Sequence, residues 1–178
     1  MNFLTTNTLL KSINKLNNIS KNKNCEIIIG GTVAAIPYIT MRKPSNIDIN
    51  LKMNNKDAFD IIKLITQDVE WKYNIHIIKN TNICKRLLSN SIIHDSLKFA
   101  PIEIVCLWKM KSIESDNNFY KHRYDIMEML KYDKIDIEWI KNELVNYYGK
   151  NNQRINEFNE MVDISKRKIT QEFKIFEV

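Results

Sequence analysis

The chain has 178 residues, of which 44% are hydrophobic and 27% are charged, and its formal net charge is +6. This length suits one domain, or a small domain with a helical appendage, and the apolar fraction is large enough to bury a core. The positive charge favours polyanionic partners such as nucleotides or RNA, but a lysine-coated surface gives the same balance.

Cysteine usage and hydropathy exclude several classes of protein. Cys25, Cys84 and Cys106 lie far apart, so the sequence contains neither a disulfide framework nor a zinc-ligand spacing. No window approaches 18 apolar residues, and residues 1–10 lack the apolar core of a signal peptide. We therefore expect a cytoplasmic protein with no membrane segment and with reduced thiols.

The first part of the chain reads as a mixture of helices and strands. Leu9, Ile13 and Leu16 recur at helical spacing and predict an amphipathic helix. That helix is followed by a strand, a short helix, an alternating strand, a helix and a further strand, giving predicted elements at 4–21, 25–30, 31–40, 46–52, 55–68 and 72–79. Two regions complete this part: 83–99 fits one or two short strands, and 101–107 reads as a strand.

From residue 108 the periodicity becomes helical and remains so. It predicts helices at 108–115, 119–131, 136–148 and 151–172. The fold class is therefore α+β, a small mixed β-sheet with flanking helices followed by a C-terminal helical subdomain. We place the boundary between residues 1–107 and residues 108–178.

A glycine pair, Gly30-Gly31, lies between the strand 25–30 and the next helix. Glycine lets backbone N–H groups approach a phosphate closely, and the following helix end favours negative charge. The same pair also fits a plain tight turn. Thr32 is either the cap of that helix or a phosphate contact.

Polar side chains alternate along the strand 46–52, at Asn46, Asp48 and Asn50. Residues two apart on a strand point to one face, and Mg²⁺ prefers hard oxygen ligands held there. Glu103, in the predicted strand 101–107, is the natural third ligand, and we expect it to converge with Asp48 over the glycine turn. Alternatively, both acids are solvated on a strand, or Asp48 caps a turn.

These residues resemble a known family. Gly30-Gly31, a helix and then Ser45-Asn46-Ile47-Asp48-Ile49 are similar to the Gly-Gly/Ser … Ser-Asp-Ile-Asp-Leu signature of the nucleotidyltransferase superfamily, which has the DNA polymerase beta-like fold. The closest resemblance is to the abortive-infection toxin type and to the minimal and aminoglycoside or lincosamide types. Members of those types begin with a helix, which is followed by Gly-Gly-Thr-Ala and then by a basic residue. In this chain Thr32 and Ala34 match the residues after the glycine pair, and Arg42 matches the basic residue.

The helical part extends the resemblance, which covers residues 25–148. Family members carry a Lys-Leu-x-Ala-like helix, a basic helix with an aspartate, and an Ile-Asp-x-x-x-Ile segment. The corresponding segments here begin at Lys109, Lys121 and Ile135. His122 stands where the family often has an aspartate.

The resemblance implies an NTP substrate, Mg²⁺ or Mn²⁺, and transfer of a nucleoside monophosphate to an acceptor such as tRNA, a protein or an antibiotic hydroxyl. It implies that Lys109 or Lys111 contacts the triphosphate and that Asp125 fixes the site or holds its helix. It also implies two sets of site residues: metal ligands Asp48, Glu103 and Asn46, and nucleotide contacts Gly30, Gly31, Thr32 and Ser45.

One departure from the family pattern bears on activity. Asn46 occupies the first aspartate position, and an amide brings no charge to a metal; with Asp48 aligned first instead, Asn50 leaves the second position uncharged. Three outcomes follow: an enzyme with fewer acids, a nucleotide-binding protein without chemistry, or a scaffold for RNA or protein. The basic and aromatic segment 119–124 either contacts RNA or packs inward.

Overall fold

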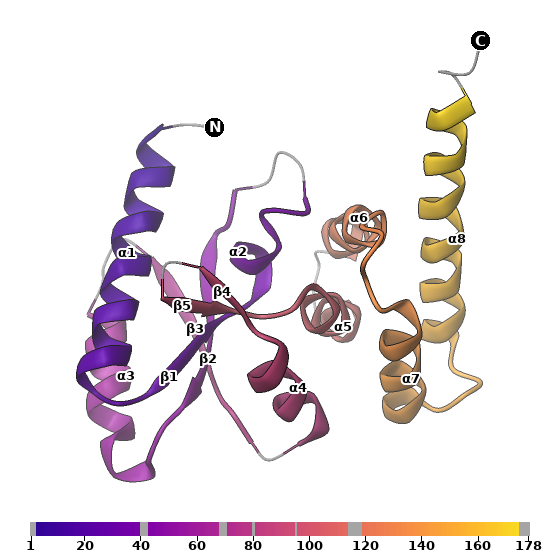
Figure 1. Cartoon of the computed structure of the whole chain (residues 1–178). Helices are drawn as coiled ribbons and strands as arrows, with labels where there is room; N and C mark the ends of the chain where they lie inside the picture. Colours follow the sequence, from indigo (N-terminus) through magenta and orange to yellow (C-terminus); the bar gives the residue numbers. More distant parts are fainter. Residues whose placement is uncertain are drawn as a thin grey trace. The chain divides into compact units, whose positions relative to one another are not determined.

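The computed structural model describes residues 3–39, 43–67, 71–79, 81–94, 96–113 and 119–174. It is an α+β protein with a five-stranded mixed sheet flanked by helices and a helical C-terminal region (Figure 1). The chain divides into two compact units, which are described separately below. The first comprises Met1–Ala34 and Met41–Pro101, and the second comprises Ala35–Thr40 and Ile102–Val178.

The first unit is built on the sheet, whose strand order is β3-β2-β1-β5-β4. Strand β1 is antiparallel to β2 and parallel to β5, β2 is parallel to β3, and β4 and β5 form an antiparallel pair. The strands are β1 (Glu26–Ile29), β2 (Asn46–Lys52), β3 (Lys72–Ile77), β4 (Ile92–His94) and β5 (Leu97–Phe99). The three strands expected near residues 25–30, 46–52 and 72–79 are thus confirmed.

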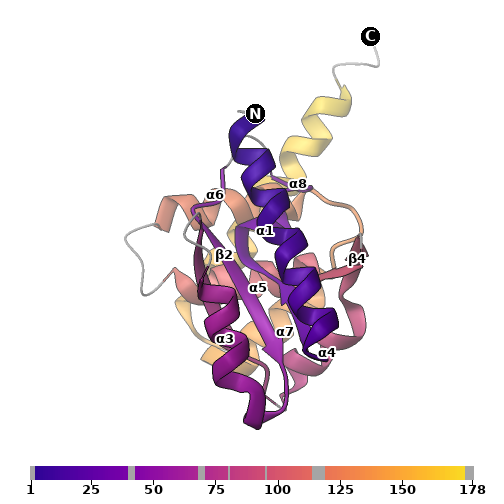
Figure 2. The same cartoon turned by 90° about the vertical axis from the view of Figure 1, so that its left-hand side faces the viewer.

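The alternation along β2 gives the sheet one apolar face and one polar face. Ile47, Ile49 and Leu51 are completely buried, whereas Asn46 and Asp48 remain partly exposed. Helices α1 (Phe3–Asn22) and α3 (Ala58–Thr66) pack on the sheet side by side (Figure 2). Their apolar residues complete the core beneath the isoleucines, as expected for amphipathic helices. The polar face carries the residues from which a site can be built.

Short elements complete the first unit. They are α2 (Gly31–Ala35), the 3₁₀ turn η1 (Asn55–Asp57) and α4 (Asn82–Asn90). Residues 83–99 contain the two short strands that the sequence allowed, β4 and β5, but α4 occupies the first part of this region, where no helix was expected. Its start is set by Thr81, whose side chain accepts a hydrogen bond from the Cys84 backbone N–H at 3.2 Å, and Leu87 buries its apolar side.

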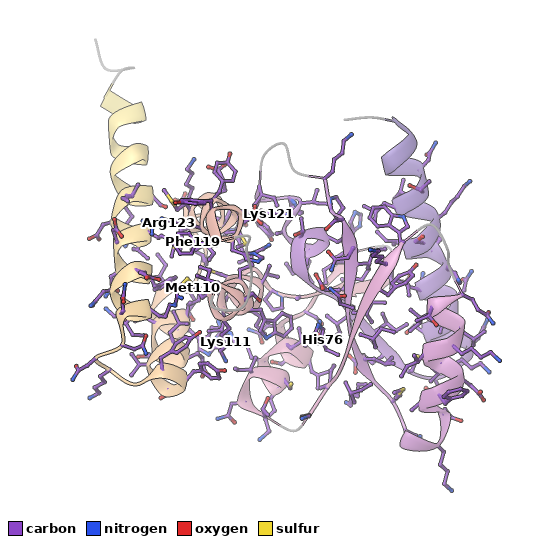
Figure 3. The ribbon with its side chains drawn as sticks, turned by 180° about the vertical axis from the view of Figure 1, so that it is seen from behind. His76, Met110, Lys111, Phe119, Lys121 and Arg123 are labelled. Carbon is purple, nitrogen blue, oxygen red and sulfur yellow. The ribbon has the colours of Figure 1, made fainter. Side chains whose placement is uncertain are left out.

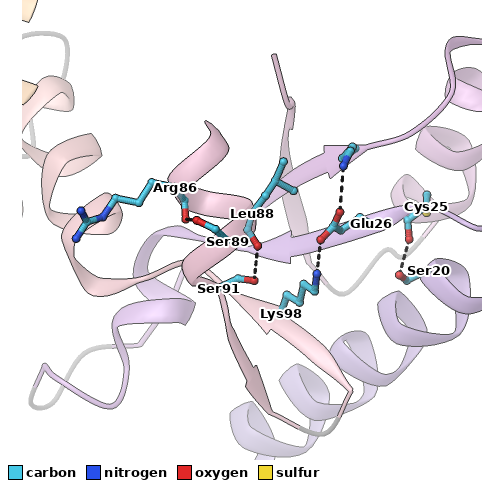
Figure 4. Close-up of polar contacts among 9 residues, drawn as sticks. Ser20, Cys25, Glu26, Arg86, Leu88, Ser89, Ser91 and Lys98 are labelled. Atoms are coloured by element: carbon cyan, nitrogen blue, oxygen red, sulfur yellow. Dashed lines mark hydrogen bonds and ion pairs between the residues drawn. The ribbon is translucent and has the colours of Figure 1, made fainter. Parts of the chain in front are cut away.

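Polar contacts link the inner strands of the sheet to one another and the end of α1 to β1 (Figure 4). Glu26 on β1 pairs with Lys98 on β5 and with Lys52 on β2, the latter at 3.7 Å. At the end of α1, the Ser20 hydroxyl donates a hydrogen bond to the Cys25 carbonyl at 2.6 Å. The Ser20–Cys25 hydrogen bond stabilises the turn between α1 and β1.

Four helices make up most of the second unit: α5 (Ile102–Ser112), α6 (Phe119–Leu130), α7 (Ile137–Tyr148) and α8 (Gln153–Lys174). Helix α5 packs against α6 and α7, and α8 packs against the same two helices. Their core includes Leu107, Ile126, Ile140 and Phe158. None of the helices in the described parts of the chain combines the length and apolar character that a membrane crossing requires.

The strand predicted over residues 101–107 is wrong, since Ile102 onward is helix α5. Residues 102–107 are buried on every side of that helix. A helix buried all round has no amphipathic period, so its apolar run cannot be distinguished from a buried strand by pattern. The units consequently divide after Pro101.

Candidate functional site

The glycine pair lies where β1 ends and α2 begins. Gly31 has a φ of +56°, a backbone conformation that favours glycine. A Cβ atom added to Gly31 would lie 1.7 Å from Asp48 Oδ2, so a side chain cannot fit there. The backbone N–H of Gly30 also donates a hydrogen bond to the Asp48 carbonyl at 2.8 Å. The turn is therefore held directly against β2.

Two amides surround the Asp48 carboxylate. The Asn46 Nδ2 donates to Asp48 Oδ1 at 3.1 Å, and the Asn74 Nδ2 donates to the same oxygen at 2.8 Å. Asn74 is the register partner of Asp48 across β2 and β3. We call Gly31, Asn46, Asp48 and Asn74 the Asp48 cluster. Within it Asp48 carries the only formal charge, and neutral donors stabilise that charge.

Residues next to the Asp48 cluster extend it along the polar face. The Ser45 hydroxyl donates to Asn46 Oδ1 at 3.3 Å. Lys72 is the register partner of Asn46 on β3 and is exposed. Because directly paired residues point to the same face, this ammonium group stands on the side that carries the Asp48 cluster.

Asn50 and Thr32 have more structural positions. Asn50 is buried, and its Nδ2 donates to the Ile28 carbonyl of β1 at 3.3 Å. Thr32 is also buried, and it is the second residue of α2, which begins at Gly31. The alternative that Thr32 caps this helix is therefore wrong, because the glycine turn itself starts the helix.

Three other expected site residues, Glu103, Lys109 and Asp125, belong to the second unit. Glu103 lies in the first turn of α5, and its Oε1 accepts a hydrogen bond from the Asp136 backbone N–H at 3.1 Å. Glu103 is therefore not an acid on a strand, and it instead anchors the start of α7. The Arg42 of the family pattern lies outside the described residues.

Lys109 and Asp125 form a buried ion pair within the second unit. The Lys109 Nζ lies 2.7 Å from Asp125 Oδ2, and the two side chains are 6% and 0% exposed. Each charge satisfies the other where water cannot, which a buried charge requires. The pair joins α5 to α6, in keeping with the alternative that Asp125 holds its helix.

Lys111, the other lysine of the family pattern, lies two residues after Lys109 on α5. Its Nζ stands 3.8 Å from the centroid of the Tyr147 ring, a cation–π contact with α7. Burial lowers the pKa of Lys111, and the nearby Glu143 opposes that shift. Lys111 and Met110 are labelled together in Figure 3.

Some of the basic and aromatic residues at the start of α6 are exposed to solvent, and others contact a neighbouring helix. Tyr120 is 83% exposed and Tyr124 is 51% exposed. Arg123, labelled in Figure 3, pairs with Glu160 of α8 at 3.1 Å. Arg123 therefore connects two helices of the second unit, while the tyrosines face outward.

The two buried thiols, Cys25 and Cys106, are not suited to act as nucleophiles. Cys25 and Cys106 are both buried. Burial raises the pKa of each thiol above its ordinary value. Because the thiolate is the reactive form, these two cysteines serve the core rather than chemistry.

The Asp48 cluster brings a single carboxylate together with amides. Two-metal transfer relies on several carboxylates around the ions. Here the groups that accompany Asp48 are amides, and both point N–H donors at its Oδ1. Within the described ranges, no group of three or more His, Cys, Asp or Glu side chains is arranged to hold a metal ion.

Asn74 was not identified from the sequence as part of the site. The alternation along β3 places Asn74 on a polar face, but only the pairing with β2 brings it to Asp48.

No protein-family model matches the sequence, and comparison with curated proteins also finds no match.

Proposed function

We propose that this chain is a nucleotidyltransferase-fold protein that binds the phosphates of a nucleotide without transferring them. The observation that carries the proposal is the Asp48 cluster, in which amides hold the carboxylate where a catalytic site would gather acids. A protein of this kind would act by sensing or sequestering nucleotide.

The groups around the cluster suit phosphate oxygens. The glycine turn brings backbone close to the polar face of the sheet, Asn46 and Asn74 carry N–H donors, and Lys72 adds a positive charge. Lys72 balances Asp48, so the net charge of this region is near zero. We expect Lys72, the amide N–H groups and the backbone of the glycine turn, rather than a metal ion, to contact the phosphate oxygens.

The test is titration calorimetry of each NTP in Mg²⁺ and in EDTA, with the wild type, Lys72→Gln and Asp48→Asn. We expect saturable binding in both buffers, a loss of about tenfold in Lys72→Gln from one lost charge-assisted contact, and retained or tighter binding in Asp48→Asn. Asp60→Asn is the matched control, because Asp60 is an exposed acid on α3.

Other outcomes would overturn the proposal. Binding that requires Mg²⁺ and disappears in Asp48→Asn, with transfer of label from NTP to RNA or protein, would show the metal-dependent enzyme instead. No binding at millimolar nucleotide would leave the scaffold function. Unfolding curves of each variant exclude a general loss of structure.

A further inference from the structure

A second polar surface lies on α1, across the sheet from the Asp48 cluster. The first acidic residue in the chain is Glu26, so α1 carries lysines without any carboxylate. Lys11, Lys15 and Lys23 line one hollow of about 480 Å³, with Leu64 of α3 on its other side. We call this hollow the α1 groove.

Asparagines fill the remaining polar positions of the α1 groove. Asn14, Asn18 and Asn22 lie at intervals of four residues, which places them in one row along the helix. Their amides can donate and accept hydrogen bonds. Helix α3 adds no net charge of its own, because Asp60 is offset by Lys63.

We propose that the α1 groove binds the sugar-phosphate backbone of a single-stranded nucleic acid. Lysines spaced along a helix, without acids, match a ligand that repeats one negative charge at every step. The amides between them suit ribose and phosphate oxygens. A concave space of about 480 Å³ admits one strand.

The packing of α1 argues against a membrane surface as the partner. Leu16 is completely buried and Ile19 is 8% exposed, since both face the core of the first unit. A helix that lies in a membrane interface needs its apolar face for the lipid. Here that face is already covered, as the position of α1 in Figure 2 shows.

The proposal predicts how binding depends on salt and sequence. Among the described residues no aromatic side chain lines the groove, so we expect no base stacking and similar binding of different sequences. Three lysines on a single strand give a slope of log K against log salt of about −2, which is a loss of about twentyfold between 50 and 200 mM salt.

The experiment is fluorescence anisotropy with short poly(U) RNA and poly(dT) DNA, using wild type and the triple variant K11Q/K15Q/K23Q. We expect the triple variant to lose at least tenfold in affinity at low salt and nearly all of the salt slope. The matched control is K79Q/K134Q/K150Q, which removes the same charge from exposed lysines elsewhere. It should keep the wild-type slope.

Several results would overturn the proposal. Equal losses in the two triple variants would mean that net charge alone attracts the nucleic acid, and an absence of binding to both polymers would remove the site. Binding to anionic phosphatidylserine vesicles but not to RNA or DNA would assign the groove to lipid. Lys72→Gln weakens the proposed nucleotide site but changes no residue that lines the α1 groove, so unchanged polymer binding by that variant separates this proposal from the proposed nucleotide site.

Discussion

The two units stabilise a key carboxylate in different ways. In the first unit, Asp48 accepts hydrogen bonds from neutral amides at the polar face of the sheet. In the second, Asp125 is completely buried and pairs with the ammonium group of Lys109. An ion pair in the interior stabilises a fixed structure, because separating the two side chains would leave a buried charge without its counter-ion. A carboxylate held by amides keeps its surroundings open to a ligand.

The largest expected effect comes from breaking the buried pair. Asp125→Asn leaves the Lys109 charge buried without its counter-ion and should lower the free energy of unfolding by about 3–5 kcal/mol. Urea unfolding followed by circular dichroism measures this change.

The matched control for that experiment is a partly buried pair within α8. Arg154 and Glu157 pair at 2.6 Å with side chains 20% exposed, so Arg154→Gln should cost at most about 1 kcal/mol. The double variant K109M/D125L should recover most of the loss, since an apolar pair avoids desolvation. A cost for Asp125→Asn no larger than that for Arg154→Gln would remove the contrast between the units.

The glycine turn should give the next largest effect. Gly31→Ala forces a Cβ to within 1.7 Å of Asp48 Oδ2 and should destabilise the first unit by about 2–4 kcal/mol. Gly149 also has a positive φ, of 86°, but a Cβ there meets nothing within 4 Å. Gly149→Ala therefore isolates the backbone strain, about 1–3 kcal/mol. Thermal unfolding of both variants measures the difference, and equal costs would argue against close packing of Gly31 on Asp48.

Adding acids to the Asp48 cluster should convert it toward a metal site. N46D/N74D places like charges beside Asp48 and should cost about 1 kcal/mol in EDTA. Mn²⁺ should restore that loss and raise the melting temperature, whereas the wild type should not respond. The control N54D/N142D adds the same charge at exposed positions. No response to Mn²⁺ in N46D/N74D would mean that these side chains do not converge on one ion.

The smallest effect concerns the ion pairs of Glu26. Glu26→Gln removes contacts with Lys52 and Lys98, whose side chains are 57% and 35% exposed. Because solvent screens such pairs, the loss should be at most about 1 kcal/mol and should shrink in high salt. A salt series of denaturant midpoints measures it. A loss that persists in high salt would point to packing instead of charge.

The sequence predicted the elements whose polar and apolar residues alternate with a clear period. Helix α1 and strand β2 each have one buried face, so their spacing can be read directly. The same alternation placed Asn46 and Asp48 on one face beside the glycine pair. Gly31 and Asp48 do lie together.

The remaining features depend on contacts between distant residues or on burial from all sides. Helix α5 lacks a period because nearly every side chain in its first two turns is buried. Asn74 reaches Asp48 only through the parallel pairing of β2 with β3. Glu103 meets the backbone of Asp136, 33 residues further along the chain, and no local pattern records that contact.

The second unit is assembled from separated pieces of chain. The chain passes between the units after Ala34, after Thr40 and after Pro101. Tyr38, from the short piece, packs edge-on against Tyr132 with ring centroids 5.0 Å apart. Cutting the gene after Pro101 would therefore leave the first fragment with all of the first unit, and would leave the second fragment without residues 35–40 of its own unit. Exchange of residues 102–178 between relatives would therefore succeed only if residues 35–40 were exchanged as well. Changes in these two regions of the chain should accordingly be inherited together.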